Sequence, residues 1–144
     1  MAENPLYFAY GSNLSETQMA ERCPGSVPLH AARLAGYRLA FGGHSTRRNG
    51  GVATILPAAR EVFVPGLLYR LTPPDLTALD GWEAYPRVYD RVQVSAEDAT
   101  GTPRRALTYV LLDFFPNPPS PEYLDIIQTA YRRFGFDPAT ISIP

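Results

Sequence analysis

The chain has very few of the residues that build disulfide frameworks and metal centres. Its 144 residues include a single cysteine, Cys23, and two histidines. One cysteine cannot form an internal disulfide, and no His, Cys, Asp and Glu residues recur at the spacing of a metal site. We therefore expect neither a disulfide-stapled domain nor a bound metal.

Long apolar stretches and an excess of one charge are also absent. No apolar run approaches the ~20 residues that span a bilayer, and the start of the chain lacks a basic segment followed by an apolar one. We expect a cytoplasmic protein without membrane contact. Thirteen basic residues face fourteen acidic ones, for a formal charge of -1. This balance disfavours nucleic-acid binding, which depends on many cationic contacts to phosphates.

Length and proline content favour one compact unit. A chain of 144 residues is long enough to bury roughly 70% of its unfolded surface around a single core, so residues 1–144 are interpreted as one domain. The fifteen prolines are about double the usual ~5% share. Because they fall mostly between the periodic segments, they mark loops and helix starts.

Hydrophobic periodicity predicts a mixed fold. Apolar or alternating segments indicate strands at residues 6–9, 32–42, 52–56, 62–71, 88–94 and 104–112. Helix-start signals at Ser15, Thr72 and Ser120 predict helices that end near residues 22, 79 and 134. Residues 42–51 read as a polar loop, and the Pro-Gly pair at 65–66 predicts a bulge or an edge position. Strands and helices do not alternate strictly, so we expect an α+β fold with a largely antiparallel sheet.

The segment Tyr7-Phe8-Ala9-Tyr10-Gly11-Ser12-Asn13-Leu14 predicts a buried strand that breaks into a turn and then opens a helix. Gly11 lets a ligand approach the main chain, and Ser15 with Gln18 has the pattern of a capping box. Unpaired N–H groups at such a helix start attract carboxylates, phosphates and oxyanions. An anion-binding loop is therefore expected at Tyr10, Gly11, Ser12, Asn13 and Leu14.

This segment resembles the signature loop of the gamma-glutamylcyclotransferase family. The resemblance continues through five later motifs and covers nearly the whole chain: Ala32-Arg33-Leu34, Gly50-Gly51-Val52-Ala53-Thr54-Ile55, Leu79-Asp80-x-x-Glu83, Thr108-Tyr109 and Pro119-Ser120-Pro121-Glu122-Tyr123. It implies a small, partly closed β-barrel flanked by helices. It also implies cofactor-independent conversion of a small gamma-glutamyl substrate to 5-oxoproline and a released amino acid.

The resemblance assigns the central chemical role to Glu83. In the motif Leu79-Asp80-Gly81-Trp82-Glu83, the family uses the glutamate as its general acid/base. A carboxyl beside Trp82 and Tyr85 in an apolar setting would have a raised pKa, as a proton shuttle needs. The family usually places glycine after this glutamate, whereas Ala84 stands here, and alanine does not take positive φ cheaply. The shape of this loop is therefore open.

Three further residues have two readings each. Asp80 could pair with Glu83, or it could bond the loop backbone at the helix end. Tyr89 could hydrogen-bond and orient Glu83, or it could pack in the core as a strand aromatic. Tyr123 matches a tyrosine that reaches towards the substrate in the family, although a tyrosine in a first helical turn also packs on a sheet commonly.

The leaving group is the least determined feature of the predicted reaction. It could be an amino acid, an amine or a capped metabolite, and a non-catalytic binding module of the same fold is a further alternative. Arg47 and Arg48 could pair with a substrate carboxylate or lie on a solvated loop. The residues of the signature loop could hold the glutamyl carboxylate or the oxyanion. The oligomeric state stays open.

Overall fold

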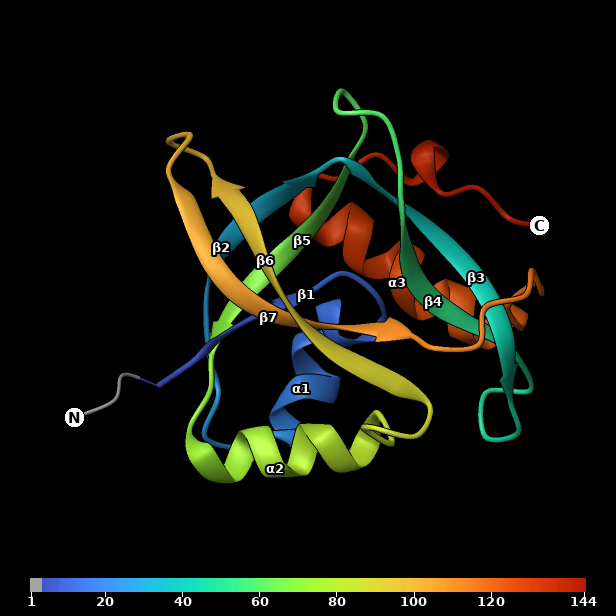
Figure 1. The fold of residues 1–144 in the computed structure, drawn as a ribbon, viewed down its shortest axis with the longest axis horizontal. Coiled ribbons are helices and arrows are strands. Elements are labelled where there is room, and N and C mark those ends of the chain that lie inside the picture. Colours follow the sequence, from blue (N-terminus) through green and yellow to red (C-terminus); the bar gives the residue numbers. More distant parts are fainter. Residues whose placement is uncertain (1–3) are drawn as a thin grey trace.

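A computed structural model describes residues 4–144 and shows a closed five-stranded barrel, a separate hairpin and three helices (Figure 1). The barrel strands follow the order β1 (Leu6–Ala9), β5 (Phe63–Arg70), β2 (Val27–Ala35), β6 (Tyr89–Asp98) and β7 (Pro103–Leu111). Neighbours pair antiparallel, except that β1 and β7 pair in parallel at Tyr7 and Leu107 and close the ring. The expected α+β barrel is confirmed, with its ring of strands closed.

Strands β3 (Tyr37–Ser45) and β4 (Gly50–Pro57) form the hairpin beside the barrel. The prediction of one strand over residues 32–42 is wrong, because Gly36 has a φ of 80° and ends β2 before β3 begins. The prediction of a loop over residues 42–51 is also wrong, since the two strands pair as far as Ser45 and Gly50. Its glycines serve close packing: a Cβ on Gly42 would lie 2.4 Å from the Phe115 carbonyl oxygen.

The helices α1 (Glu16–Arg22), α2 (Pro73–Trp82) and α3 (Pro121–Phe134) begin at the predicted caps. The side chain of Ser15 accepts a hydrogen bond from the Gln18 N–H, as in a capping box. The Gln18 side chain does not complete the box, because it bonds to other residues described below. Helix α3 ends as predicted at Gly135, with a φ of 75°. Helix α2 runs to Trp82, so that Glu83 is the first residue after it.

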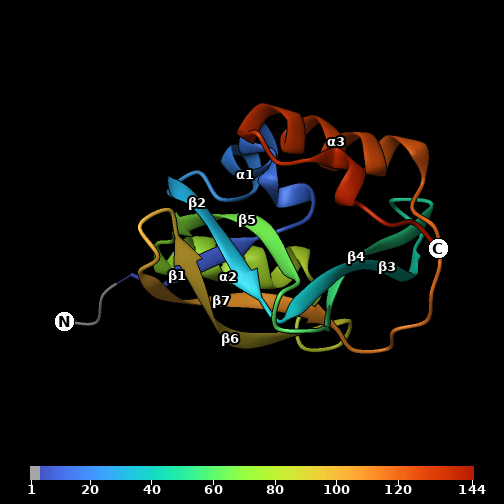
Figure 2. The ribbon, with the colours of Figure 1, turned by 90° about the horizontal axis from the view of Figure 1, so that it is seen from above.

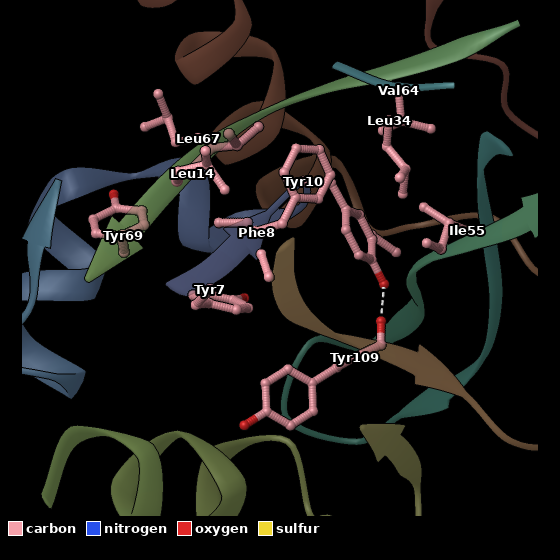
Figure 3. Close-up of a cluster of buried hydrophobic side chains, with 14 of the residues drawn as sticks. Tyr7, Phe8, Tyr10, Leu14, Leu34, Ile55, Val64, Leu67, Tyr69 and Tyr109 are labelled. Atoms are coloured by element: carbon pink, nitrogen blue, oxygen red, sulfur yellow. Dashed lines mark hydrogen bonds between the residues drawn. The ribbon is translucent and has the colours of Figure 1, made fainter. Parts of the chain in front are cut away.

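Helices α1 and α3 lie together on one side of the barrel, as Figure 2 shows, whereas α2 runs across its lower end in Figure 1. The core fills the barrel and extends towards the hairpin, with Phe8, Leu14, Leu34, Ile55 and Tyr69 almost fully buried (Figure 3). This arrangement brings the end of β1, the end of α2 and the hairpin to one side of the core.

Strand β5 shows where the Pro-Gly pair fits. It pairs with β2 along its length but with β1 only from Leu67, so Pro65 lies where β5 has one neighbour, which is the predicted edge position. The bulge is in β2 instead, between Pro28 and His30.

No helix within residues 4–144 combines the length and the apolar character of a membrane span.

Candidate active site

A cavity of about 660 Å³ opens where the end of β1, the end of α2, the β3–β4 hairpin and the segment after β7 meet. This volume lies within the range of small-molecule sites, about 300–1,000 Å³. The polar and charged side chains that line it include Ser12, Asn13, Arg22, Ser45, Arg47, Arg48, Glu83, Arg87 and Asp113, and the aromatic ones include Tyr7, Tyr10, Trp82, Tyr89, Tyr109, Phe115 and Tyr123.

The predicted anion-binding loop forms one wall. Residues Ser12–Leu14 make a 3₁₀ turn in which the Leu14 N–H donates to the Gly11 carbonyl at 3.0 Å. Within residues 4–144, the N–H groups of Gly11, Ser12 and Asn13 have no protein acceptor. The expectation for Leu14 is wrong, because its side chain is fully buried in the core (Figure 3) and its N–H is already bonded.

Glu83 reaches the same cavity from the end of α2, where its N–H bonds the Leu79 carbonyl at 2.9 Å. Burial raises the pKa of its carboxyl from 4.5 to about 7, while Arg22, Arg47 and Arg48 act in the opposite direction. The Asn13 side-chain amide approaches Glu83 Oε1 at 3.4 Å. A carboxyl balanced near neutrality can both accept and return a proton.

Gln18 links the loop to the hairpin, a role that its capping pattern did not indicate. Its Nε2 donates to Ser12 Oγ at 2.9 Å and to Asn13 Oδ1 at 2.8 Å. Its Oε1 accepts a hydrogen bond from Arg48 at 2.8 Å. Arg22, also absent from the predicted site, donates to Asn13 Oδ1 at 3.3 Å. Both residues lie on α1 at the i and i+4 spacing that places them on one helix face, which is the signal that sequence analysis could have used.

Four arginines line the cavity without a carboxylate partner. Among residues 4–144, no Asp or Glu oxygen lies within 4.0 Å of a guanidinium nitrogen of Arg22, Arg47, Arg48 or Arg87. Arg22 and Arg47 stack on the Trp82 ring, at 4.6 and 4.7 Å from its centroid, and Arg48 lies 5.2 Å from the centre of the Tyr123 ring. The cavity therefore carries positive charge, and neutral or aromatic partners hold Arg22, Arg47 and Arg48 in place.

Residues 7–131 match the family described as "Gamma-glutamyl cyclotransferase, AIG2-like". The chain belongs to this family. A gamma-glutamylcyclotransferase from Mus musculus is 32% identical over 138 residues, which cover 92% of this chain and 73% of the relative. The Homo sapiens protein of the same name is 31% identical over equal shares. A solved structure named gamma-glutamyl cyclotransferase aligns with a TM-score of 0.90 at 27% identity, covering 99% of this chain and 90% of the other. The protein is an enzyme.

Ala84, the residue after Glu83, adopts a backbone conformation that is uncommon for alanine. Its φ is 50°, in the left-handed region that glycine adopts at little cost. The Ala84 carbonyl accepts hydrogen bonds from the N–H groups of Arg87 and Val88, at 2.8 and 2.9 Å. These two hydrogen bonds hold Ala84 in the left-handed backbone conformation, although alanine disfavours it. They therefore fix the turn that follows Glu83.

The predicted tyrosines line the cavity while their hydroxyls bond the main chain. Tyr89 does not orient Glu83, because its hydroxyl donates to the Ala53 carbonyl at 2.7 Å from a buried position. The Tyr123 hydroxyl accepts a bond from the Ala53 N–H at 3.0 Å. The Tyr10 hydroxyl donates to the Tyr109 carbonyl (Figure 3). The bonds to Ala53 tie the barrel and α3 to strand β4, and the Tyr10 bond ties the end of β1 to β7. Together they fix the cavity wall.

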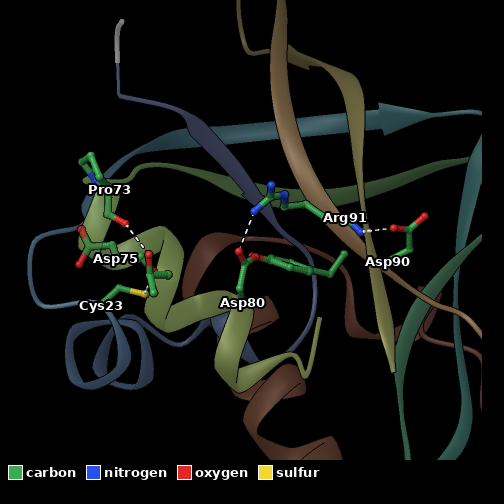
Figure 4. A network of polar contacts seen from close by, with 8 residues as sticks. Cys23, Pro73, Asp75, Asp80, Asp90 and Arg91 are labelled. Atoms are coloured by element: carbon green, nitrogen blue, oxygen red, sulfur yellow. Dashed lines mark hydrogen bonds and ion pairs between the residues drawn. The ribbon is translucent and has the colours of Figure 1, made fainter. Parts of the chain in front are cut away.

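The Asp80 carboxylate does not pair with Glu83, whereas the main-chain carbonyl of Asp80 bonds the loop backbone by accepting the Tyr85 N–H at 2.9 Å. The Asp80 carboxylate pairs instead with Arg91 at 2.7 Å (Figure 4) and accepts a hydrogen bond from the Tyr109 hydroxyl at 2.6 Å. The Asp80 side chain therefore joins α2 to strands β6 and β7 and does not form a carboxylate pair with Glu83.

Within residues 4–144, no group of three or more His, Cys, Asp or Glu residues could hold a metal ion.

Proposed function

We propose that this protein is a gamma-glutamylcyclotransferase with Glu83 as its general acid/base. The substrate is a gamma-glutamyl conjugate whose free α-amino group attacks its own γ-carbonyl carbon, giving 5-oxoproline and a released amino acid or amine. The observation that carries the proposal is the Glu83 carboxyl, which faces a 660 Å³ cavity with a pKa raised by burial to about 7. Membership of the family supports the same reaction.

The proton that leaves the substrate returns to the product. Ionised Glu83 removes a proton from the α-ammonium group, and the freed nitrogen forms a C–N bond to the γ-carbonyl carbon. The tetrahedral intermediate then breaks its bond to the original amide nitrogen, which takes the proton back from Glu83. The lactam nitrogen gives up its second proton to the released amine, which leaves as an ammonium ion. One C–N bond forms and one breaks, with no net uptake of water, protons or electrons. A pKa near neutrality suits both transfers.

The N–H groups of Gly11, Ser12 and Asn13 support binding of an anionic oxygen of the glutamyl group, since they line the cavity without a protein acceptor among residues 4–144. Such preorganised donors stabilise negative charge that develops during acyl transfer. Tyr10, Tyr89 and Tyr123 act as rigid walls around the curled glutamyl chain, and holding its reacting groups in line lowers the barrier further.

The test is release of 5-oxoproline from gamma-glutamyl amino acids and amines by the wild type, Glu83→Gln and Glu61→Gln. Glu61 is exposed and lies outside the cavity, so its substitution controls for the loss of one carboxylate. We expect Glu83→Gln to lower kcat by about 10²- to 10⁴-fold, the usual contribution of general acid/base catalysis, with conjugate affinity retained.

The outcomes separate the two parts of the proposal. Turnover by Glu83→Gln within tenfold of the wild type would refute the role of Glu83 and leave the reaction standing. No release by the wild type from any conjugate would refute the reaction. A melting temperature raised by conjugates in that case would identify a binding module of the same fold.

A further inference from the structure

The positive charge around the cavity exceeds what a gamma-glutamyl amine can satisfy. Arg22, Arg47, Arg48 and Arg87 face Glu83 and Asp113, so the lining carries four cationic and two acidic side chains. A gamma-glutamyl amine has one carboxylate and one ammonium group, whereas a gamma-glutamyl amino acid has a second carboxylate. An arginine with no carboxylate beside it gains most from such a partner, because the charge-assisted bidentate pair is strong.

The four arginines differ in how firmly the protein holds them. Arg22 donates to Asn13, and Arg48 donates to Gln18 and lies over Tyr123. Arg47 has no hydrogen-bond acceptor or carboxylate among residues 4–144, and its guanidinium lies over the Trp82 ring at 4.7 Å. Arg47, at the tip of the hairpin, and Arg87 are both exposed and have no carboxylate partner among residues 4–144. Of these two, Arg47 is the one that an aromatic ring holds in position to receive a group from solvent.

Large apolar side chains stand exposed at the same cavity. Trp82, Val88 and Phe115 all line it, and their exposed fractions are 46%, 46% and 53%. They come from the end of α2, the segment before β6 and the segment after β7, so the fold gathers them from separate parts of the chain. Exposed apolar residues gathered at a pocket indicate a binding surface.

We propose that the outer part of the cavity is a leaving-group subsite for an amino acid with a free carboxylate and a large apolar side chain, with Arg47 binding the carboxylate and Val88 and Phe115 contacting the side chain. This inference rests on the proposed function and names its substrate class. Trp82 holds the Arg47 guanidinium by a cation–π contact and extends the apolar surface beneath it. Glu83 and the signature loop serve the glutamyl half, and these residues serve the half that leaves.

Four conjugates form a factorial test: gamma-glutamyl-phenylalanine, gamma-glutamyl-phenethylamine, gamma-glutamyl-alanine and gamma-glutamyl-ethylamine. Each amine differs from its amino acid by the carboxylate alone, and the two amino acids differ by the phenyl group alone. We expect the carboxylate to raise kcat/KM about 10- to 100-fold, as charge-assisted hydrogen bonds do. We expect the phenyl group to raise it about 10-fold, as burial of apolar surface does.

Two variants assign the contacts, and a third serves as control. Arg47→Gln should remove the preference for amino acids over amines, because its effect on the pKa of Glu83 acts on all four conjugates alike and cancels in the ratio of their kcat/KM values. Phe115→Ala should lower kcat/KM for the two phenyl conjugates alone. Arg60→Gln removes one exposed arginine outside the cavity and should leave all four values unchanged. Equal losses on all four conjugates in Arg47→Gln would place this arginine on the glutamyl half and overturn its assignment.

Affinities measured by calorimetry with Glu83→Gln, which holds the conjugates intact, test the subsite without turnover. The same order of affinities supports the subsite even if no 5-oxoproline forms, so that its failure and the failure of the proposed reaction are distinguishable. Equal affinities for gamma-glutamyl-alanine and gamma-glutamyl-ethylamine would overturn the carboxylate contact. Equal affinities for the phenylalanine and alanine conjugates would overturn the apolar one.

Discussion

Replacing Glu83 by glutamine should stabilise the folded protein while it removes activity. The pKa of Glu83 is about 7 in the folded protein, against 4.5 for an ordinary glutamate, because burial disfavours the ionised form more than the nearby arginines favour it. Between these two values the folded state binds more protons than the unfolded state, so stability falls as the pH rises. The penalty is complete above the folded pKa and absent below the unfolded one.

The size of the effect follows from the pKa difference. Each pKa unit corresponds to ~1.4 kcal/mol, so ionised Glu83 lowers the free energy of unfolding by about 3 kcal/mol at about pH 8 and by less than about 1 kcal/mol at about pH 5. Glutamine carries no charge to bury. We expect Glu83→Gln to exceed the wild type in stability by about 2–3 kcal/mol at about pH 8, which is roughly 4–10 °C in Tm.

Urea unfolding of both proteins at about pH 5, 6, 7 and 8 checks this expectation. Subtracting the free energies of unfolding of the two proteins removes the contributions of the other titrating groups. Glu61→Gln, which removes an exposed carboxylate, should have the stability of the wild type at each pH. A stability difference that stays constant from about pH 5 to about pH 8 would refute the raised pKa. A less stable variant at about pH 8 would refute the burial penalty itself.

Three further outcomes are expected. Ala84→Gly should raise stability by about 0.5–1 kcal/mol in urea unfolding, because alanine at a φ of 50° costs about 1–2 kcal/mol and glycine loses part of this gain as chain entropy; an unchanged or lower stability contradicts this. Arg22→Gln removes a charge that lowers the pKa of Glu83, so the acid limb of kcat/KM for 5-oxoproline release should move to higher pH, and an unmoved limb contradicts the contact. In the wild type, the acid limb of kcat should lie at higher pH than that of kcat/KM, and coincident limbs contradict this.

The sequence predicted the starts of the helices well, because a helix cap bonds residues that are close to it in the chain. The caps at Ser15, Thr72 and Ser120 lie beside the residues that they bond, and each helix begins there. The boundary at Gly36 was missed because apolar alternation continues across it. Its positive φ separates two strands that belong to different sheets, and the periodicity of side chains carries no information about that turn.

Sequence motifs identified the residues of the candidate site that lie within a motif. They did not predict hydrogen-bond partners that come from distant parts of the chain. Burial of Glu83 and the resulting rise of its pKa match the sequence interpretation, although the three arginines that oppose the rise come from α1 and from the hairpin. Gln18 has the spacing of a capping residue, but its amide gains three partners, one of them Arg48 from 30 positions away. The family resemblance suggested that Tyr89 orients Glu83, whereas its hydroxyl bonds the Ala53 carbonyl of strand β4.

The balance at Glu83 couples its basicity to the charge of the substrate. Burial alone would keep the carboxyl protonated at neutral pH, and the arginines alone would make it too weak a base. Arg22 and Arg48 bond neutral amide groups, so their positive charges are not neutralised by a protein carboxylate and lower the pKa of Glu83 in the free enzyme. The carboxylates of a bound conjugate neutralise the arginine charges that lower the pKa of Glu83, so the carboxyl becomes a stronger base wherever this effect exceeds the opposing effect of the substrate ammonium group. The kcat profile reports this complex and the kcat/KM profile reports the free enzyme, so the separation of their acid limbs measures the coupling.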